Sequence, residues 1–287
     1  MKIGTGLPIA IPGTQANLLL EWAKRAEQGP FSSLGVLDRV VYDNYEPLIT
    51  LAVVAGVTTR LRLVTTVLLA PTRNTGILAK QAASLDALSG GRLTLGLGIG
   101  GRKDDFLAAP ADFHTRGKRF NEQLEFFERA WSGQPINDQI GPIGPTPARP
   151  GGPEILIGGY SGAAIQRLSR WGNGFIAGGR APDQVKQFFQ MARDAWQKAG
   201  RPGQPRLAAI AYYGLGPQAT EGIEKYITHY YSFLGPAAQQ MAKNVPSSPE
   251  AVRTLIQAFS DLGVDEVLIG PCIPELDQID RLADAIK

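Results

Sequence analysis

The chain of 287 residues contains a single cysteine, Cys272, and only two histidines, His114 and His229. One cysteine cannot form an intramolecular disulfide, and it excludes a metal site built from several thiolates. Two histidines that lie far apart in the sequence likewise exclude a His-rich zinc site, so we expect no metal. The lone thiol fits a reducing compartment, and we expect a cytoplasmic protein.

The chain also lacks a strong charge of either sign and a long apolar run. Its 29 basic and 26 acidic residues are interspersed and give a formal net charge of +3. Without a basic stripe we expect no nucleic acid partner. The N-terminal segment has one lysine and no sustained apolar stretch before Pro8 and Pro12, so neither a signal peptide nor a membrane contact is expected.

What the sequence does contain is a repeated alternation of short apolar strands and amphipathic helical patterns. This alternation is typical of a parallel sheet covered by helices. Strands are predicted at residues 2–6, 33–37, 61–69, 93–97, 155–157, 175–177, 206–215 and 266–270. Since no change of composition marks a linker, we predict one domain over residues 1–287, a closed (β/α)8 TIM barrel with insertions. A doubly wound sheet is the alternative.

Three segments depart from this rhythm. Residues 98–113 form a long connection after the fourth strand, and residues 102–106 are predicted to begin it as a loop. Residues from about 133 to 153 are irregular and proline-rich, and a helical insertion is predicted at about 218–245. Long connections in compact domains are usually functional.

The run GLGIGG after the fourth strand satisfies the glycine spacing of a dinucleotide fingerprint, with Gly96, Gly98 and Gly101 in the three positions. That fingerprint requires a helix at the last glycine and an acidic strand end about twenty residues later. Neither pattern follows here, so we reject a dinucleotide-binding fold.

Two neighbouring strands end in glycine pairs. The strand 155–157 runs into Gly158 and Gly159 before a helical pattern opens, and the strand 175–177 runs into Gly178 and Gly179. Glycines let backbone N–H groups approach an oxyanion, an N-cap serine adds a hydroxyl, and the helix N-terminus adds a partial positive charge. The sequence therefore predicts a phosphate cradle, although such glycines can also merely turn strands into helices. Its residues are Gly158, Gly159, Tyr160, Ser161, Gly178 and Gly179.

Polar residues at other strand ends are candidates for the same mouth of the barrel. Asp38 ends the second strand, where it could accept a hydrogen bond from a ligand or pair with Arg39. Thr65 and Thr66 lie within the third strand, and their hydroxyls need either a ligand or the sheet as partner. His114 follows the fourth strand and could face the mouth. His229 lies among aromatic residues in the insertion, and packing is the expected role.

The run from Thr65 through VLLAPTRNTGILAKQAASLDALSGGRLTLGLGIGG resembles the luciferase-like flavin-dependent oxidoreductases, the bacterial luciferase family. The resemblance lies in the order of motifs: the AKQ-containing helix, LDxLSGGR, LGLGxG and then ILIGGYS. It covers essentially the whole chain, more weakly at residues 135–153 and after 218. It implies a TIM barrel that binds FMN or the deazaflavin coenzyme F-420 at its C-terminal mouth.

Carried over by position, the cradle would hold the cofactor phosphate. Thr66 and Val67 fall where the family often has a cis peptide bond against the flavin ring, and Gly98 is a further cofactor contact. Asp38 matches an aspartate that often closes the second strand. Many members follow it with histidine where this chain has Arg39, which cannot act as a base but can orient an anion. The catalytic candidates are Asp38, Arg39 and His114.

The resemblance implies an oxidoreductase in which the cofactor carries the redox chemistry. We predict monooxygenation of a small organic substrate by reduced FMN and oxygen, with hydride transfer by the deazaflavin as the alternative. Lys103, Arg149 and Arg180 could hold a longer anionic cofactor tail. A non-catalytic flavin-binding protein and a barrel enzyme for a phosphorylated metabolite are the remaining alternatives.

The resemblance also predicts partners. It implies a homodimer formed through the second and third helices, and a separate flavin reductase is expected if the cofactor is FMN.

Overall fold

The computed structural model describes residues 1–287 as a closed barrel of eight parallel strands in chain order. Strand β8 pairs with β1 from Lys2–Glu266 to Thr5–Ile269 and so closes the barrel. The predicted (β/α)8 TIM barrel is confirmed, and the doubly wound alternative is wrong. The strands are β1 (Lys2–Gly6), β2 (Ser33–Val36), β3 (Arg62–Leu69), β4 (Leu93–Gly98), β5 (Glu154–Gly158), β6 (Gly174–Gly178), β7 (Arg206–Tyr213) and β8 (Glu266–Pro271).

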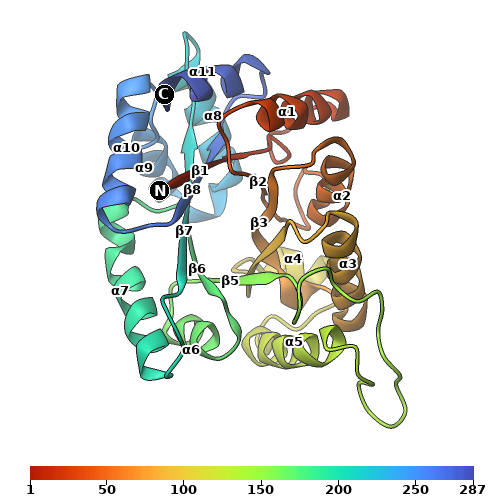
Figure 1. Cartoon of the computed structure of the whole chain (residues 1–287). Helices are drawn as coiled ribbons and strands as arrows, with labels where there is room; N and C mark the ends of the chain where they lie inside the picture. The colour runs from red at the N-terminus through yellow and green to blue at the C-terminus, as the bar shows by residue number, and fades with distance from the viewer.

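Helices surround the barrel, and their apolar faces form the main core against the outer face of the strands (Figure 1). Local signals set their starts: the side chains of Asn74 and Ser161 cap α3 and α6, and Pro47 begins α2. These helices are α1 (Ala16–Gln28), α2 (Pro47–Val57), α3 (Thr75–Leu88), α5 (Arg116–Trp131), α6 (Gly162–Trp171), α7 (Pro182–Lys198), α10 (Pro249–Asp261) and α11 (Asp277–Ala285).

The prediction that residues 102–106 form a loop is wrong, because α4 (Lys103–Ala108) begins there. A helix of six residues has too few intrahelical hydrogen bonds to be stable alone. Tertiary contacts hold it, since Phe106 is buried and the carboxylate of Asp105 accepts hydrogen bonds from the N–H groups of Val40 and Val41. A local sequence pattern does not contain that information.

The predicted helical insertion consists of α8 (Ala219–Tyr230), η2 (Ser232–Leu234) and α9 (Pro236–Lys243), and a further short turn, η1 (Ala70–Thr72), follows β3. Residues 132–153 contain no helix or strand, as expected. Gly152 has φ +105° and lies so close to Trp131 that a Cβ there would come within 2.1 Å of the indole ring. This segment is therefore packed against α5 at its end.

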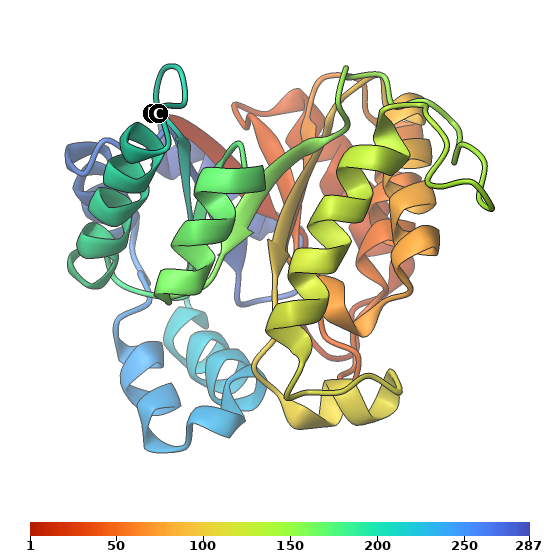
Figure 2. The same cartoon turned by 90° about the horizontal axis from the view of Figure 1, so that it is seen from below.

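Figure 2 shows the insertion α8–α9 and α4 at one end of the barrel, and the irregular segment before β5 at the other. The first end carries the C-terminal ends of the strands, and we call it the mouth. The second carries their N-terminal ends, and we call it the closed end. None of the helices is both long enough and apolar enough to cross a bilayer.

Candidate functional site

The predicted cradle is formed where β5 turns into α6. Gly159 has φ +130°, a conformation that favours glycine, and Ser161 accepts a hydrogen bond from the N–H of Ala164 at 3.3 Å. The backbone N–H groups of Gly162 and Ala163 have no partner in the protein. As the first donors of a helix, they form a site of partial positive charge.

The end of β6 lies beside this turn. The hydroxyl of Tyr160 donates to the carbonyl oxygen of Gly178 at 2.7 Å and so ties the two strand ends together. Burial raises the pKa of Tyr160, which keeps the hydroxyl protonated as a donor. The guanidinium of Arg180 lies 4.3 Å from the centroid of the Tyr160 ring. The two glycine turns and one cation therefore meet at the mouth.

Next to the cradle lies a cavity of about 260 Å³, which we call the ring cavity. Its wall includes the peptide bond between Thr66 and Val67, which is cis as the resemblance predicts. A Cβ at Gly98 or Gly158 would come within 2.9 or 3.0 Å of the Val67 side chain, so these glycines make room for it. The cavity is lined by Leu37, Asp38, Arg39, Thr66, Val67, Leu69, Gly101, Arg102, Asp105, Gly158, Gly159, Tyr160, Ile176, Gly178, Ile210, Tyr230, Tyr231 and Phe233.

The two threonines of β3 use the sheet as their hydrogen-bond partner. Thr65 Oγ1 donates to the carbonyl oxygen of Gly96 at 2.8 Å, and Thr66 Oγ1 donates to that of Val36 at 3.0 Å. These hydroxyls therefore do not need a ligand as a hydrogen-bond partner.

Asp38 lies at the ring cavity with both carboxylate oxygens engaged. It forms an ion pair with Arg73 at 2.6 Å and accepts a hydrogen bond from the N–H of Leu69 at 2.7 Å. Burial raises the pKa of the Asp38 carboxyl, and the guanidinium of Arg73 opposes this. The suggested ion pair with the adjacent Arg39 is wrong, because Asp38 pairs with Arg73 and Arg39 pairs with Asp105.

Arg39 is paired with Asp105 of α4 at 3.1 Å, and both side chains are buried. Its guanidinium lies 5.3 Å from the ring centroid of Tyr42 and 5.8 Å from that of Tyr230. A guanidinium keeps its charge at all ordinary pH values. Arg39 therefore brings a fixed cation to the wall of the ring cavity.

The two histidines occupy different surroundings. His114 is exposed beside the Phe113 ring and borders neither the ring cavity nor the larger groove described below. His229 is also exposed, but its ring packs against that of Tyr42, with centroids 5.4 Å apart, and its Nδ1 lies 2.7 Å from the Tyr42 hydroxyl. Sequence reasoning missed this pair because the two residues are 187 positions apart.

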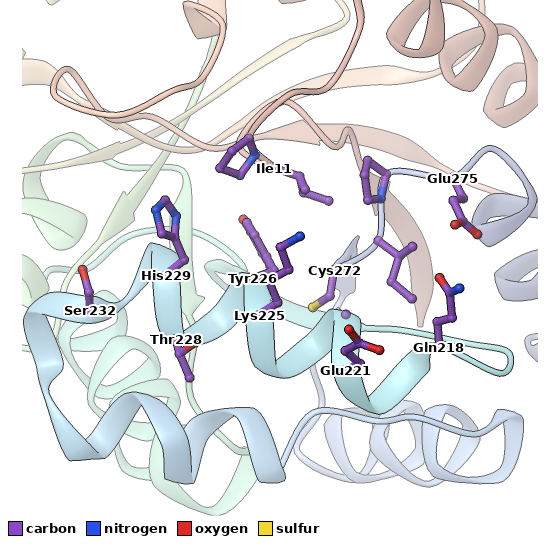
Figure 3. Close-up of a pocket in the computed structure, with 14 residues that line it drawn as sticks. Ile11, Gln218, Glu221, Lys225, Tyr226, Thr228, His229, Ser232, Cys272 and Glu275 are labelled. Carbon is purple, nitrogen blue, oxygen red and sulfur yellow. The ribbon is translucent and has the colours of Figure 1, made fainter.

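A groove of about 710 Å³ runs along α8, and we call it the α8 groove. Figure 3 shows Tyr226, Lys225 and His229 projecting from α8 toward the segment that carries Ile11. Glu221, Lys225 and Glu275 in its lining form no ion pair. The lining residues are Ile11, Pro12, Gln218, Glu221, Gly222, Lys225, Tyr226, Thr228, His229, Ser232, Cys272, Ile273, Pro274 and Glu275.

A third, small cavity of about 20 Å³ lies between the two larger ones. It shares Ile11 and Tyr226 with the α8 groove, and it shares Leu37, Thr66 and Ile210 with the ring cavity. The three cavities therefore form one series across the mouth.

The cations suggested for a cofactor tail are not together. Arg180 lies at the cradle, and Lys103 begins α4 at the same end of the barrel. Arg149 precedes β5, where its N–H donates to Asp86, and so it lies at the closed end. Arg149 is therefore excluded from the tail site.

Residues 1–259 match the family described as luciferase-like monooxygenase. An uncharacterized protein of Mycobacterium tuberculosis is 28% identical over 242 residues, covering 74% of this chain and 82% of the relative. An F420-dependent hydroxymycolic acid dehydrogenase of the same organism is 28% identical over 215 residues, covering 69% of this chain and 59% of that protein.

A solved structure shares the fold. The monooxygenase RslO1 from Streptomyces bottropensis superposes with a TM-score of 0.81 at 22% identity, over 100% of this chain and 97% of that one. Together with the family match over most of the chain, the closed barrel and the cis bond at Thr66–Val67, this places the protein in the luciferase-like monooxygenase family.

Proposed function

We propose that the protein is an oxidoreductase that binds a flavin or deazaflavin cofactor, with the cofactor phosphate at the cradle and the ring in the ring cavity. The observation that carries this proposal is the pair of unbonded N–H groups at Gly162 and Ala163, beside glycine turns from two strand ends. Such donors at a helix N-terminus bind phosphate well. The bound cofactor would supply the redox chemistry.

The chain's own residues would position that cofactor. Val67 would contact the ring at the cis bond, and Arg39, held by Asp105, would present its guanidinium at the cavity wall. Tyr230, Tyr231 and Phe233 of the insertion would cover the ring on the solvent side.

Of the two cofactors, we place the deazaflavin first, with hydride transfer as the reaction. A relative that matches 69% of this chain is described as an F420-dependent dehydrogenase. Hydride transfer needs no oxygen, but reduction of a carbonyl does need a proton donor. His229 at the α8 groove offers an imidazole for that purpose.

The second candidate is monooxygenation with reduced FMN and oxygen, in which a separate reductase would supply the flavin. The matched family and the structural neighbour RslO1 are both described as monooxygenases. A non-catalytic flavin-binding protein and an enzyme for a phosphorylated metabolite would use the same cradle.

The cradle can be tested with two substitutions of one residue. Ser161→Asp adds a negative charge at the phosphate site, whereas Ser161→Asn is neutral, and both residues are good N-caps that preserve α6. We expect Ser161→Asp to weaken cofactor binding about 100-fold or more through charge repulsion, and Ser161→Asn to weaken it less than about fivefold. Fluorescence titration with FMN and with the deazaflavin measures both.

The outcomes separate the alternatives. Binding of one cofactor with this pattern supports the proposal and selects the reaction to assay. If the two variants bound the cofactor with equal affinity, the cofactor phosphate would not lie beside Ser161. That result would contradict the proposed site. Binding of phosphate esters without either cofactor would favour the enzyme for a phosphorylated metabolite.

We also propose that the protein is a homodimer that buries α2 against a second copy. Ile49, Val53 and Val57 recur on one outer face of α2 and are 65%, 51% and 36% exposed, and Ile77 of the adjacent α3 is 57% exposed. An apolar stripe of this size usually marks an interface. Ile49→Glu combined with Val53→Glu should give a monomer by sedimentation velocity, and a wild-type monomer would contradict the proposal.

A further inference from the structure

We infer that His229 exchanges a proton with a substrate held in the α8 groove, and that this substrate is an organic carbonyl compound or the corresponding alcohol. This inference rests on the proposed oxidoreductase function. It assigns an acid–base role to α8, since at the end of β2 Asp38 is paired with Arg73 and Arg39 cannot give up a proton.

The geometry of His229 suits proton exchange. Its Nδ1 lies 2.7 Å from the Tyr42 hydroxyl, and Nε2 has no hydrogen-bond partner in the protein. A partner on one ring nitrogen fixes the tautomer and the orientation of the other. Burial raises the pKa of Tyr42 to about 12, while Arg39 opposes this, so the hydroxyl stays intact near neutral pH. His229 is thus a held imidazole with one nitrogen available.

Tyr42 connects His229 to the ring cavity. Its ring meets that of Tyr230 edge to face, with centroids 5.0 Å apart, and Tyr230 lines the ring cavity. The guanidinium of Arg39 lies against the same Tyr42 ring. One aromatic residue therefore separates the imidazole from the fixed cation, which cannot itself give up a proton.

The α8 groove provides a place for the substrate. Ile11, Tyr226 and Ile273 give it apolar surface for an organic body. The small cavity beyond Tyr226 has room for about one water-sized group, and Thr66 borders both it and the ring cavity. The groove therefore holds a substrate between His229 in its lining and the small cavity that leads toward the ring cavity.

The reaction balances with these groups. In the direction of reduction, the bound cofactor would supply a hydride to the carbonyl carbon, and the carbonyl π electrons would move to the oxygen. That oxygen takes a proton from Nε2 of the protonated imidazole and becomes a hydroxyl. Oxidation of the alcohol reverses both transfers, with neutral His229 as the base. Other titratable or charged groups around the imidazole are Arg39, Tyr42, Glu221, Lys225, Tyr226 and Glu275.

The first test observes the imidazole directly. Only two histidines contribute to the ¹⁵N spectrum of histidine-labelled protein, and His114→Asn identifies which signals belong to His229. We expect the ¹⁵N shifts of neutral His229 to show a single tautomer in the wild type. In Tyr42→Phe we expect shifts averaged over both tautomers. Averaging in the wild type would overturn the inference, because the imidazole would not be held.

The second test measures the reaction. Protein loaded with reduced deazaflavin is mixed without oxygen with acetone, cyclohexanone or benzaldehyde, and oxidation of the cofactor is followed by absorbance. We expect His229→Asn to slow this single turnover at least about 100-fold with an unchanged cofactor Kd. His114→Asn is the matched control and should behave as wild type, since His114 borders no part of the site.

The outcomes distinguish this inference from the proposed function. Cofactor binding without turnover of any carbonyl probe, or an unchanged rate in His229→Asn, would overturn the inference and leave the proposed function standing. Failure of the wild type to bind any flavin or deazaflavin would overturn both.

Discussion

The two ends of the barrel use buried charge differently. At the closed end, Arg206 of β7 bridges the carboxylates of Glu154 on β5 and Glu266 on β8, and Arg62 of β3 lies 3.5 Å from Glu154. Strands β5 and β8 are not neighbours in the barrel, so the Arg206 side chain crosses its interior. Ser32 and Ser33 donate to Glu266 as well. The charges at this end satisfy one another inside the barrel.

At the mouth, the charged pairs stand around the rim. Asp38 binds Arg73 and the backbone of β3, and Asp105 binds Arg39 and the backbone that follows β2. Each carboxylate holds a connecting segment in place, and the space between them stays open as the ring cavity. Charged pairs that reach across the barrel fill the interior of one end, whereas charged pairs along the rim keep the other end open for binding.

The largest effect is expected from breaking the network of the closed end. Arg206→Met leaves Glu154 and Glu266 buried without their shared cation, which should lower the free energy of unfolding by about 3–5 kcal/mol. Urea unfolding at pH 7 measures this change. Because the network lies at the opposite end from the cradle, the cofactor Kd of the folded variant should equal that of the wild type.

Arg253→Ala is the control for this substitution, since it removes an exposed ion pair with Glu250 and should change stability by less than about 0.5 kcal/mol. A cofactor Kd that rises in Arg206→Met would show that the two ends are coupled. The closed end would then contribute to binding as well as to stability.

A smaller loss of stability, combined with a loss of binding, is expected at the mouth. Asp38→Asn removes the charge that pairs with Arg73 but keeps an acceptor for the N–H of Leu69. Arg73 retains Glu46 at 3.1 Å, so we expect a loss of about 2 kcal/mol. Since Asp38 and Leu69 both line the ring cavity, the cofactor Kd should rise at least about threefold.

Urea unfolding and cofactor titration of the same preparation test the Asp38→Asn prediction together. If Asp38→Asn lost stability without any change in cofactor Kd, the charged pairs of the mouth would serve only stability, as those of the closed end do.

Removing one hydroxyl between the two strand ends should have a milder effect. Tyr160→Phe deletes the hydrogen bond to Gly178 and leaves the ring in place beside Phe188. We expect a loss of about 1 kcal/mol in stability and a roughly fivefold rise in cofactor Kd, because the two turns of the cradle are no longer tied. Thermal unfolding with and without cofactor measures both, and an unchanged Kd would exclude a role for this bond in the cradle.

The sequence predicts the barrel, the cradle and the cis bond because each depends on local patterns or on a family motif. Strand and helix alternate within short windows, and Gly158 to Ser161 form one continuous turn. The adjacent residues Asp38 and Arg39 suggested an ion pair, but each pairs with a residue 35 or 66 positions away. A sequence pattern gives no distance between such positions.

The same limit applies to α4 and His229. The helix α4 is held by contacts of Asp105 and Phe106 with other segments, and Tyr42, the partner of His229, is 187 positions away in the sequence. The Arg206 network had no signal in the sequence either, since its members begin four separate strands. Residues that meet only after the barrel closes therefore required the structure.

The smallest expected effect concerns Glu27 of α1, which holds a connecting segment at the closed end as Asp105 does at the mouth, but in contact with solvent. Its carboxylate accepts hydrogen bonds from the N–H groups of Thr59, Arg60 and Leu61. Burial acts to raise the pKa of Glu27, but these donors outweigh it and hold the pKa below its ordinary value. A pKa that is lower in the folded state gives stability that is present above the unfolded value and is lost as pH falls through the folded one.

The difference in unfolding free energy between wild type and Glu27→Gln should therefore be below about 1 kcal/mol at pH 7, because solvent screens the group, and should vanish toward pH 3. Urea unfolding at pH 7, 5, 4 and 3 measures this difference. A constant difference over that range would mean that the hydrogen bonds do not depend on the charge, and that solvent-exposed and buried carboxylates hold these segments in the same way.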